Sequence, residues 1–305
     1  MPPSDRILVI WNPAAGPDTG DRNRKVLVEG LDEKDYELRE WQKGSDPRDW
    51  FRDISGDTYG LVMAAGGDGT VTAVVDALLW NDFPLPVAIF PTGSANAIAA
   101  ELGYPDSLED VIPWVFRQET VSFDAGFLRE RDRYFIMSVS SGLHADIVKD
   151  TSPSSKRIFG WLAYVFSAIP EILRRKWHRV RLLMDGKELT CRSNAVVVLN
   201  LASTIPGTDA LPGSIDPSDG RMNVLVNRRG SFSELLKVIL GSLVGKRYRL
   251  QRLESLKAGN IRIEAEPPMS LQMDGETIGS TPVEIEVEPG AVRIRGVPEA
   301  AAEEG

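Results

Sequence analysis

The stretch Gly66-Gly67-Asp68-Gly69-Thr70 combines residue types whose chemistry suits a phosphate group. It follows the apolar run YGLVMAA and precedes the helical pattern Val71–Trp80. Glycine lets a backbone approach a ligand closely and adopt positive φ, and the amides at the start of a helix attract an anion. We interpret the stretch as a phosphate-binding loop, although a tight turn between strand and helix is an alternative that this pattern alone leaves open.

Two further loops of this kind follow other apolar runs. Asn12-Pro13-Ala14-Ala15-Gly16 comes after RILVI, and Pro91-Thr92-Gly93-Ser94-Ala95-Asn96 ends the run PVAIFP. Because ligands of parallel sheets bind beyond the carboxyl ends of the strands, the three loops are expected to surround one crevice. Asp68 adds a carboxylate, which would repel a polyphosphate unless a cation or an exchangeable proton lies between them. Magnesium coordination or proton handling is therefore expected.

The elements that position these loops alternate between strand and helix up to about Phe123. The predicted strands are RILVI, YELREW, YGLVMAA and PVAIFP, and the predicted helices are Asp21–Leu31, Asp46–Ile54, Val71–Trp80 and Ala95–Leu102. Continuous apolar strands that alternate with helices are typical of a parallel sheet covered on both faces. The first part of the chain is thus predicted to be an α/β domain.

The pattern changes after Phe123. Segments in which apolar and polar residues alternate are RVRLLMDGKELTCR, NIRIEAE, VEIEVEPG and AVRIRGV, several of them separated by Asp-Gly or Pro-Gly turn signals. This alternation and the turn signals predict a mostly antiparallel, sandwich-like β domain, with helices near Ile158–Leu173 and Ser231–Val244. We expect an α/β domain over residues 1–123, a β-rich domain over 124–298 and an acidic tail over 299–305.

Composition excludes several classes of protein. The 305 residues carry a net charge of -9 with a pI near 5.0, which argues against a nucleic-acid-binding protein. The single cysteine, Cys191, cannot form an internal disulfide, and the start lacks the apolar core of a secretory signal, so a cytoplasmic location is expected. The longest apolar stretch, Ile158–Ile169, is shorter than the about 20 residues of a membrane span. Any membrane contact is therefore expected to be peripheral, at the inner face.

The ordered set of motifs resembles the diacylglycerol kinase catalytic family, in particular its bacterial soluble lipid kinases, which are related to sphingosine kinases and to NAD kinases. The shared motifs are the three loops, Ser141-Gly142-Leu143, the GWLAY helix, Ser218-Asp219-Gly220 and Asp274-Gly275-Glu276. The resemblance implies an amino-terminal nucleotide domain, a β-rich lipid domain and a cleft between them. It also implies that the protein uses ATP and Mg²⁺ to phosphorylate a hydroxyl of a diacylglycerol-like lipid at a membrane surface.

The resemblance assigns a role to individual residues. The implied nucleotide-binding residues are Asn12, Gly66, Gly67, Asp68, Gly69, Thr70, Val71, Thr72, Gly93, Ser94 and Asn96. Glu276 matches the catalytic base, and Asp68, Asp124 and Asp274 would position magnesium and water. From the residues alone, MSLQMDGETIG is equally a strand followed by an Asp-Gly hairpin turn.

A second magnesium position is implied in the β-rich domain. Asp216, Asp219 and the carbonyl of Arg221 match it by spacing, and oxygen ligands suit this hard cation. A solvated loop rich in Pro, Ser, Asp and Gly is the alternative.

Four residues depart from the family pattern. Thr72 and Asp76 replace asparagines, Glu40 stands where a threonine is common, and Ala97 replaces an acidic residue. Ala97 removes one carboxylate from the implied magnesium network. A kinase for another acceptor, such as a sphingoid base or NAD, and a non-catalytic nucleotide or lipid sensor therefore stay open as alternatives.

The apolar segment from Ile158 leads into five cations between Arg174 and Arg181. Apolar area beside basic charge is typical of interfacial membrane binding, whereas a core helix followed by a solvated basic edge is the alternative. The sequence leaves the oligomeric state open, a homodimer included.

Overall fold

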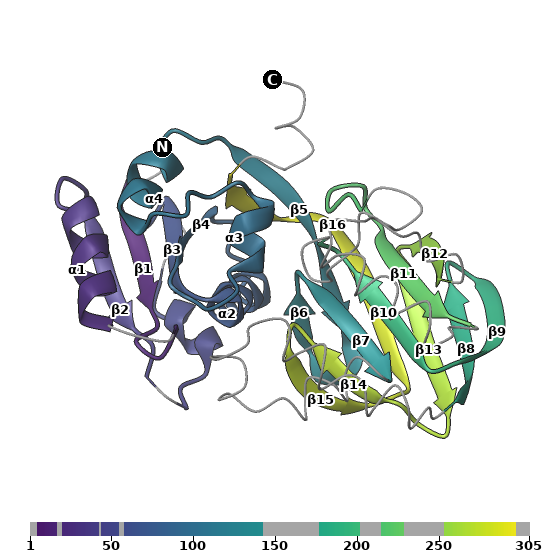
Figure 1. Ribbon diagram of the computed structural model, residues 1–305. Helices are drawn as coiled ribbons and strands as arrows, with labels where there is room; N and C mark the ends of the chain where they lie inside the picture. Colours follow the sequence, from purple (N-terminus) through teal and green to yellow (C-terminus); the bar gives the residue numbers. More distant parts are fainter. Residues whose placement is uncertain are drawn as a thin grey trace, which may run out of the picture. The chain divides into compact units, whose positions relative to one another are not determined.

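The computed structural model describes residues 5–16, 20–42, 44–54, 58–142, 177–201, 215–228 and 253–296. The chain divides into two compact units (Figure 1). The first comprises Met1–Ala125, Arg133–Ile136 and Pro289–Gly305, and the second comprises Gly126–Asp132 and Met137–Glu288. The α/β and antiparallel β architectures expected from the sequence are both present.

The first unit is built on four parallel strands. They are β1 (Ile7–Trp11), β2 (Tyr36–Glu40), β3 (Leu61–Gly66) and β4 (Val87–Pro91), in the order β2-β1-β3-β4. Every residue of β1 and β3 is buried, as expected for strands covered on both faces. The predicted strands are confirmed to within two residues at each end, and the loops that follow β1, β3 and β4 share one edge of the sheet.

Helices connect these strands. They are α1 (Gly20–Gly30), the 3₁₀ helix η1 (Pro47–Phe51), α2 (Asp68–Trp80), α3 (Ala97–Glu101) and α4 (Leu108–Val115). The step from β1 to β2 and the step from β3 to β4 run in opposite directions across the sheet. Because parallel crossovers are right-handed, the helices in these two connections, α1 and α2, cover opposite faces of the sheet. The sequence patterns did not predict α4, which contains Pro113 and packs against α1.

The last strand of the chain corrects one prediction. β16 (Val283–Arg295) runs without a break through Pro289-Gly290, where a turn was expected. Gly290 does have a positive φ of 61°, but its amide donates to Oδ1 of Asp124 at 2.8 Å rather than closing a turn. A Pro-Gly pair whose glycine has a positive φ therefore marks an irregularity within one strand here.

The final part of β16 belongs to the first unit. Ile294 pairs with Val87 of β4 in parallel register, and the hydroxyl of Tyr104 donates to the carbonyl of Arg295 at 2.6 Å. The same hydroxyl accepts the amide of Ile89 at 3.1 Å. The bounds of the observed units thus differ from the expected second domain over 124–298. Residues 124–125, 133–136 and those from Pro289 onward belong to the first unit.

The second unit contains antiparallel strands throughout its described residues. One group has the order β12-β11-β10-β7-β14-β15 and comprises β12 (Leu253–Ala258), β11 (Met222–Asn227), β10 (Ala195–Leu199), β7 (Ser138–Gly142), β14 (Ser270–Met273) and β15 (Glu276–Ser280). The other comprises β13 (Asn260–Glu266), β8 (His178–Met184) and β9 (Lys187–Ser193), with the first part of β16 paired to β13. Burial alternates strictly along β8, as expected for a sheet with one solvated face.

Short elements link the units along the chain. β5 (Thr120–Leu128) begins in the first unit and ends in the second, and η2 (Arg129–Arg131) and β6 (Arg133–Phe135) follow it. Several predictions concern residues outside the described ranges. They are the helices Ile158–Leu173 and Ser231–Val244, most of the basic segment after the first of these helices, Leu143 and the tail 299–305. Within the described part of the chain, no helix is long and apolar enough to cross a membrane.

Candidate functional site

The three predicted phosphate loops meet in the first unit. The amide of Asn12 donates to the carbonyl of Ala65 at 2.9 Å, and the amide of Thr92 donates to the carbonyl of Gly66 at 3.0 Å. These bonds continue the parallel ladders of β1, β3 and β4 into the loops. The ends of the three strands therefore place the loops side by side, and the crevice that the loops are expected to surround stays a prediction.

Glycine is required where these loops touch. A Cβ on Gly93 would overlap the Cα of Gly67 and lie 2.7 Å from Oδ1 of Asn96. A Cβ on Gly16, whose φ is +89°, would overlap the carbonyl of Thr92. Close backbone packing thus brings all three loops together.

Gly66 and Gly69 differ within the first loop. A Cβ on Gly66 would overlap the side chain of Thr70, whereas a Cβ on Gly69 would have no heavy atom within 4 Å. Gly69 is exposed and lies in the first turn of α2, where backbone amides lack partners within the helix. The space beside it suits an anion at the start of this helix.

Asn12 and Thr70 join the first two loops through their side chains. Nδ2 of Asn12 donates to Oγ1 of Thr70 at 2.9 Å, and the amide of Ala14 donates to Oδ1 of Asn12 at 3.0 Å. Thr70 is buried. Both predicted nucleotide-binding residues therefore hold the loops in shape.

Asn96 closes the third loop on itself. Its Oδ1 accepts the amide of Gly93 at 2.8 Å, and its Nδ2 donates to the carbonyl of Gly93 at 3.0 Å. Its φ of 49° is one that asparagine tolerates better than most residues. Ser94 is exposed between Gly93 and Asn96.

Asp68 connects the first glycine loop to the helix that follows the third. It is the first residue of α2, and its Oδ1 accepts the amide of Ile98 in α3 at 3.0 Å. A carboxylate has two oxygens with about four acceptor sites, so this bond leaves capacity for a further partner. The side chains of Val71 and Thr72, in contrast, are buried within the packing of α2.

In the second unit, Asp274-Gly275 forms a two-residue hairpin turn between β14 and β15. Asp274 has a φ of 44° and Gly275 a φ of 91°, and Met273 pairs with Glu276 across the turn. Oδ1 of Asp274 accepts the amides of Met137 at 3.2 Å and Ser138 at 2.8 Å. The hairpin is confirmed, and Glu276 is exposed as the first residue of β15.

Comparison with known families agrees with this geometry. Residues 6–128 match the diacylglycerol kinase catalytic domain, and residues 137–296 match the YegS C-terminal NAD kinase beta sandwich-like domain. The chain belongs to this diacylglycerol kinase family. The second match covers just over half of the chain.

Relatives resemble the chain over most of its length. A Staphylococcus aureus (strain MRSA252) protein named "Putative lipid kinase SAR0780" is 25% identical over 88% of this chain and 86% of its own. Another from strain bovine RF122 / ET3-1, "Putative lipid kinase SAB0675c", is 26% identical over 77% of this chain and 76% of its own. The crystal structure of "a putative diacylglycerol kinase from Bacillus anthracis str. Sterne" has a TM-score of 0.79, with 20% identity and 96% of both chains covered. The Bacillus anthracis protein shares the fold of the chain.

The departures from the family pattern lie at the elements just described. Ala97 is the first residue of α3, next to the Ile98 amide that Asp68 binds, and Glu40 is the last residue of β2. Thr72 is buried in α2. Ala97 is thus near Asp68 in the structure but offers no carboxylate.

Asp76 has a partner that the sequence did not reveal. Arg48 of η1 donates to both of its oxygens at 3.1 Å, and the Tyr134 amide donates to Oδ1 at 2.8 Å. The Arg48 guanidinium also lies 3.8 Å from the ring centre of Trp80. Arg48 and Asp76 are 28 residues apart, so no local pattern could have paired them. The ion pair compensates for the charge that replaces a neutral asparagine.

The residues expected to hold magnesium make hydrogen bonds of their own. Asp124 is fully buried and accepts the Gly290 amide. Within the described ranges, no group of three or more His, Cys, Asp or Glu side chains is placed to hold a metal ion. Asp68 nevertheless suits magnesium bound to a nucleotide, since such an ion takes one or two carboxylates and completes its shell with phosphate oxygens and water.

The loop of Asp216 and Asp219 has the bonds of an ordinary turn. Ser218 donates its amide and hydroxyl to Oδ1 of Asp216, and the Arg221 amide donates to Oδ1 of Asp219 at 3.0 Å. The Lys257 ammonium pairs with Oδ2 of Asp219. The donors are of the right type for magnesium, but three of their four oxygens already accept bonds. Magnesium at this loop stays a prediction.

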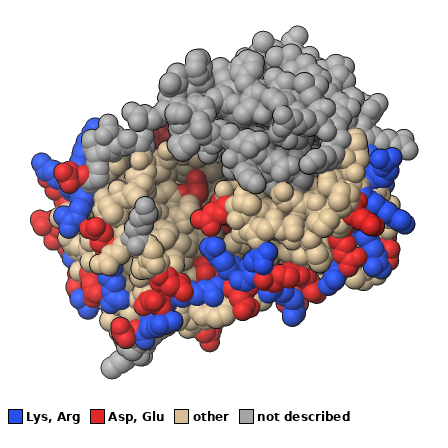
Figure 2. All heavy atoms as spheres, turned by 90° about the horizontal axis from the view of Figure 1, so that it is seen from below, with Lys and Arg blue, Asp and Glu red and all other residues tan. Residues whose placement is uncertain are grey.

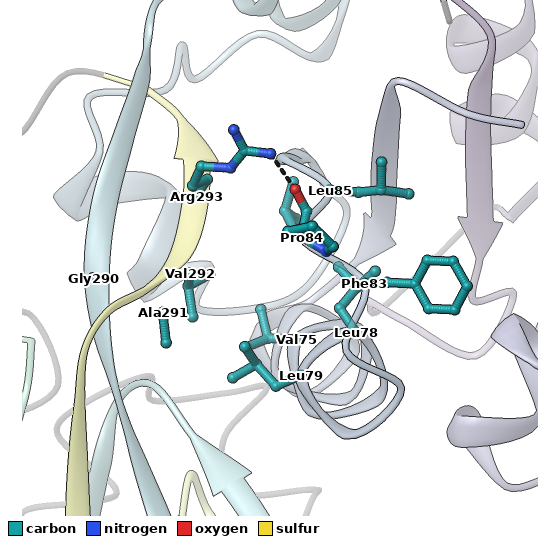
Figure 3. A pocket seen from close by; sticks show the side chains of 11 residues that line it. Val75, Leu78, Leu79, Phe83, Pro84, Leu85, Gly290, Ala291, Val292 and Arg293 are labelled. Carbon is teal, nitrogen blue, oxygen red and sulfur yellow. Dashed lines mark hydrogen bonds between the residues drawn. The ribbon is translucent and has the colours of Figure 1, made fainter. Parts of the chain in front are cut away.

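A small apolar pocket lies at the opposite end of the strands from the phosphate loops. Its volume is about 140 Å³, and α2 residues, the segment Phe83–Leu85 and β16 residues 290–293 line it (Figure 3). Arg293 closes one side by bonding to the carbonyl of Pro84. The pocket reaches Val87, which is the first residue of β4, whereas the third loop follows the last residue of that strand. The pocket is therefore no part of the predicted phosphate site.

Several charges on the solvated strands of the second unit are paired. Arg181, the last cation of the predicted basic segment, binds Glu188 and Glu264, and Arg262 binds Glu264 and Glu284. Figure 2 shows the cationic and anionic side chains interspersed on the face that it displays. Arg181 therefore belongs to a mixed charged surface.

Proposed function

We propose that this protein is an ATP- and magnesium-dependent lipid kinase that transfers the γ-phosphate to a hydroxyl of a diacylglycerol-like lipid at a membrane surface. The observation that carries the proposal is the close packing of three glycine-containing loops at the carboxyl edge of one parallel sheet. Kinase family membership and the lipid kinase names of the relatives support the acceptor class.

Each part of the site has a role in this reaction. The backbone amides at the start of α2 bind the phosphates of ATP, and the space beside Gly69 admits them. Asp68 holds the magnesium ion, which neutralises phosphate charge when bound. Packing of Gly16 on Thr92 and of Gly67 on Gly93 fixes the loops before the nucleotide arrives. Positioning of this kind supplies most of the catalysis in phosphoryl transfer.

Glu276 is the proposed general base. Its carboxylate accepts the proton of the lipid hydroxyl while that oxygen forms a bond to the γ-phosphorus and the bond to the ADP oxygen breaks. The products are ADP and a phosphorylated lipid. Glu276 is exposed at the start of β15, where a substrate can reach it.

Radiolabelled ATP with a panel of lipid alcohols in mixed micelles tests the activity. We expect Glu276→Gln to reduce turnover by at least about 100-fold while ATP binding is retained. Glu188→Gln is the matched control, since Glu188 is an exposed strand glutamate outside the site, and it should keep full turnover. Absence of product with every alcohol, from folded protein with magnesium, rejects the proposal.

Two alternatives have specific support. The match of residues 137–296 to an NAD kinase-like sandwich favours NAD as another acceptor, so the panel includes NAD and a sphingoid base. The missing carboxylate at Ala97 favours a sensor that binds nucleotide without consuming it. Calorimetry on the same samples distinguishes the sensor, which releases heat on binding ATP but produces no ADP.

A further inference from the structure

The second unit contains two hairpin turns with the same sequence and backbone. Asp185-Gly186 joins β8 to β9 with φ values of 48° and 78°, and Asp274-Gly275 joins β14 to β15 with φ values of 44° and 91°. Both residues of each turn have positive φ, as a two-residue type I′ hairpin requires. The residue after the turn is Lys187 in one hairpin and Glu276 in the other.

The aspartate of each turn also makes the same pair of hydrogen bonds. Oδ1 of Asp185 accepts the successive amides of Gly259 at 3.1 Å and Asn260 at 2.9 Å. Oδ1 of Asp274 accepts the successive amides of Met137 and Ser138. One oxygen thus anchors each hairpin tip to the start of the adjacent strand. Because the Asp185 turn carries none of the predicted site residues, the shared arrangement is explained by structure alone.

The strand that Asp274 binds is itself held a few residues earlier. In the first unit the Tyr134 amide donates to Asp76 of α2, and four residues further along the chain the Ser138 amide donates to Asp274. The segment between them is therefore bonded at both ends by carboxylates. Within the second unit, the hairpin is thus attached to the backbone amides of Met137 and Ser138.

We infer that Asp274 is a positioning residue, whose carboxylate oxygen sets the place of Glu276 by anchoring the β14–β15 turn to the amides of Met137 and Ser138. This inference rests on the proposed function for the role of Glu276. It replaces the expectation that Asp274 positions magnesium and water. The role needs an acceptor oxygen on a residue that tolerates positive φ, and it does not need a negative charge.

Two substitutions of Asp274 and one of Asp185 separate the possible contributions. Asn keeps both the acceptor oxygen and the tolerance for positive φ, and it removes only the charge. Gly keeps the backbone conformation and removes the acceptor. Asp185→Gly removes the equivalent anchor from the other hairpin and is the matched control for loss of stability.

The first measurement is hydrogen exchange of backbone amides in the full chain. Asp274→Gly should speed exchange at Met137, Ser138 and Glu276 by at least about 10-fold, whereas Asp274→Asn should leave it within about 3-fold of the wild type. Unchanged exchange in Asp274→Gly overturns the anchor, whether or not the protein phosphorylates a lipid.

The second measurement is steady-state kinetics with the acceptor that the panel identifies. Asp274→Gly should lower kcat by about 100-fold, the scale expected for a misplaced catalytic group, with KM for ATP within about 2-fold. Asp274→Asn should recover kcat to within about 10-fold of the wild type, and Asp185→Gly should not lower it. A kcat for Asp274→Asn as low as that for Asp274→Gly overturns the positioning role. A wild type without turnover rejects the proposed function instead, and the exchange result then stands separately.

Discussion

Gly67 and Gly93 of the first unit pack backbone against backbone at ordinary φ, whereas Gly275 of the second unit has a φ of +91° and no heavy atom within 4 Å of an added Cβ. The first pair needs glycine because a side chain does not fit. Position 275 needs glycine because most residues do not adopt that backbone conformation. The same residue type therefore marks a crowded contact in one unit and an open turn in the other.

Carboxylates differ between the units in a parallel way. Asp76 is buried in the first unit and is neutralised by Arg48 as well as bonded to the Tyr134 amide. Asp274 anchors its hairpin through bonds to the backbone amides of Met137 and Ser138. A buried charge needs a countercharge, whereas a carboxylate at a turn needs only donors. Substitutions in the two units should therefore fail for different reasons.

The largest effect is expected from Arg48→Met, which leaves the Asp76 carboxylate buried without its countercharge. Breaking a buried ion pair from one side costs about 3–5 kcal/mol. Urea unfolding measures the loss, and Asp76→Asn in the same chain should recover most of it. A double variant no more stable than Arg48→Met would show that the arginine matters through packing on Trp80.

Gly93→Ala should be next, because its Cβ overlaps the Gly67 backbone, which has little freedom to move. Overpacking of this kind costs about 3 kcal/mol and should also abolish ATP binding measured by calorimetry. Gly69→Ala is the matched control for stability. Its Cβ has open space within α2, so the free energy of unfolding should rise by up to about 1 kcal/mol. A Gly93→Ala protein with normal ATP binding would contradict the packed-loop description.

Tyr104→Phe should destabilise the first unit by about 2 kcal/mol, because the buried Ile89 amide loses its acceptor. Burial raises the pKa of Tyr104 above its ordinary value, since the charged form is disfavoured inside the protein. The wild type therefore keeps this stabilisation below the ordinary tyrosine pKa of about 10 and loses it as the pH rises above that value. The difference in the free energy of unfolding between the wild type and Tyr104→Phe should be smaller at pH 10.5 than at pH 8. An equal gap at both pH values would contradict the role of burial.

The smallest effect is expected at Gly275. Gly275→Ala should cost about 1 kcal/mol through its positive φ, and Gly275→Asn should cost less because asparagine tolerates this region better. At Gly93 the order should reverse, since asparagine is larger than alanine. Thermal unfolding of the four variants tests the comparison directly, and the same order at both positions would contradict it.

Local patterns in the sequence were sufficient to predict the parallel strands and the three loops. Continuous apolar runs that end in glycine-rich segments define both the elements and the sheet edge where they meet. The Asp-Gly turns were equally readable, because positive φ restricts the residue types at these positions. Contacts between distant residues could not be predicted in this way. Nothing in the sequence near Arg48 indicates Asp76 as its partner, and nothing near Tyr104 indicates Arg295. The Pro-Gly pair in β16 was misread because its amide partner, Asp124, lies far away in the sequence.

The course of β16 has a consequence for the synthesis of the protein. The fourth strand of the parallel sheet, β4, is complete at Pro91, but the strand that pairs with it at Ile294 leaves the ribosome some two hundred residues later. Tyr104 must likewise wait for the carbonyl of Arg295. The first unit is therefore finished last although it is made first. A fragment that ends near residue 123 would have every phosphate loop and still expose an unpaired edge of its sheet.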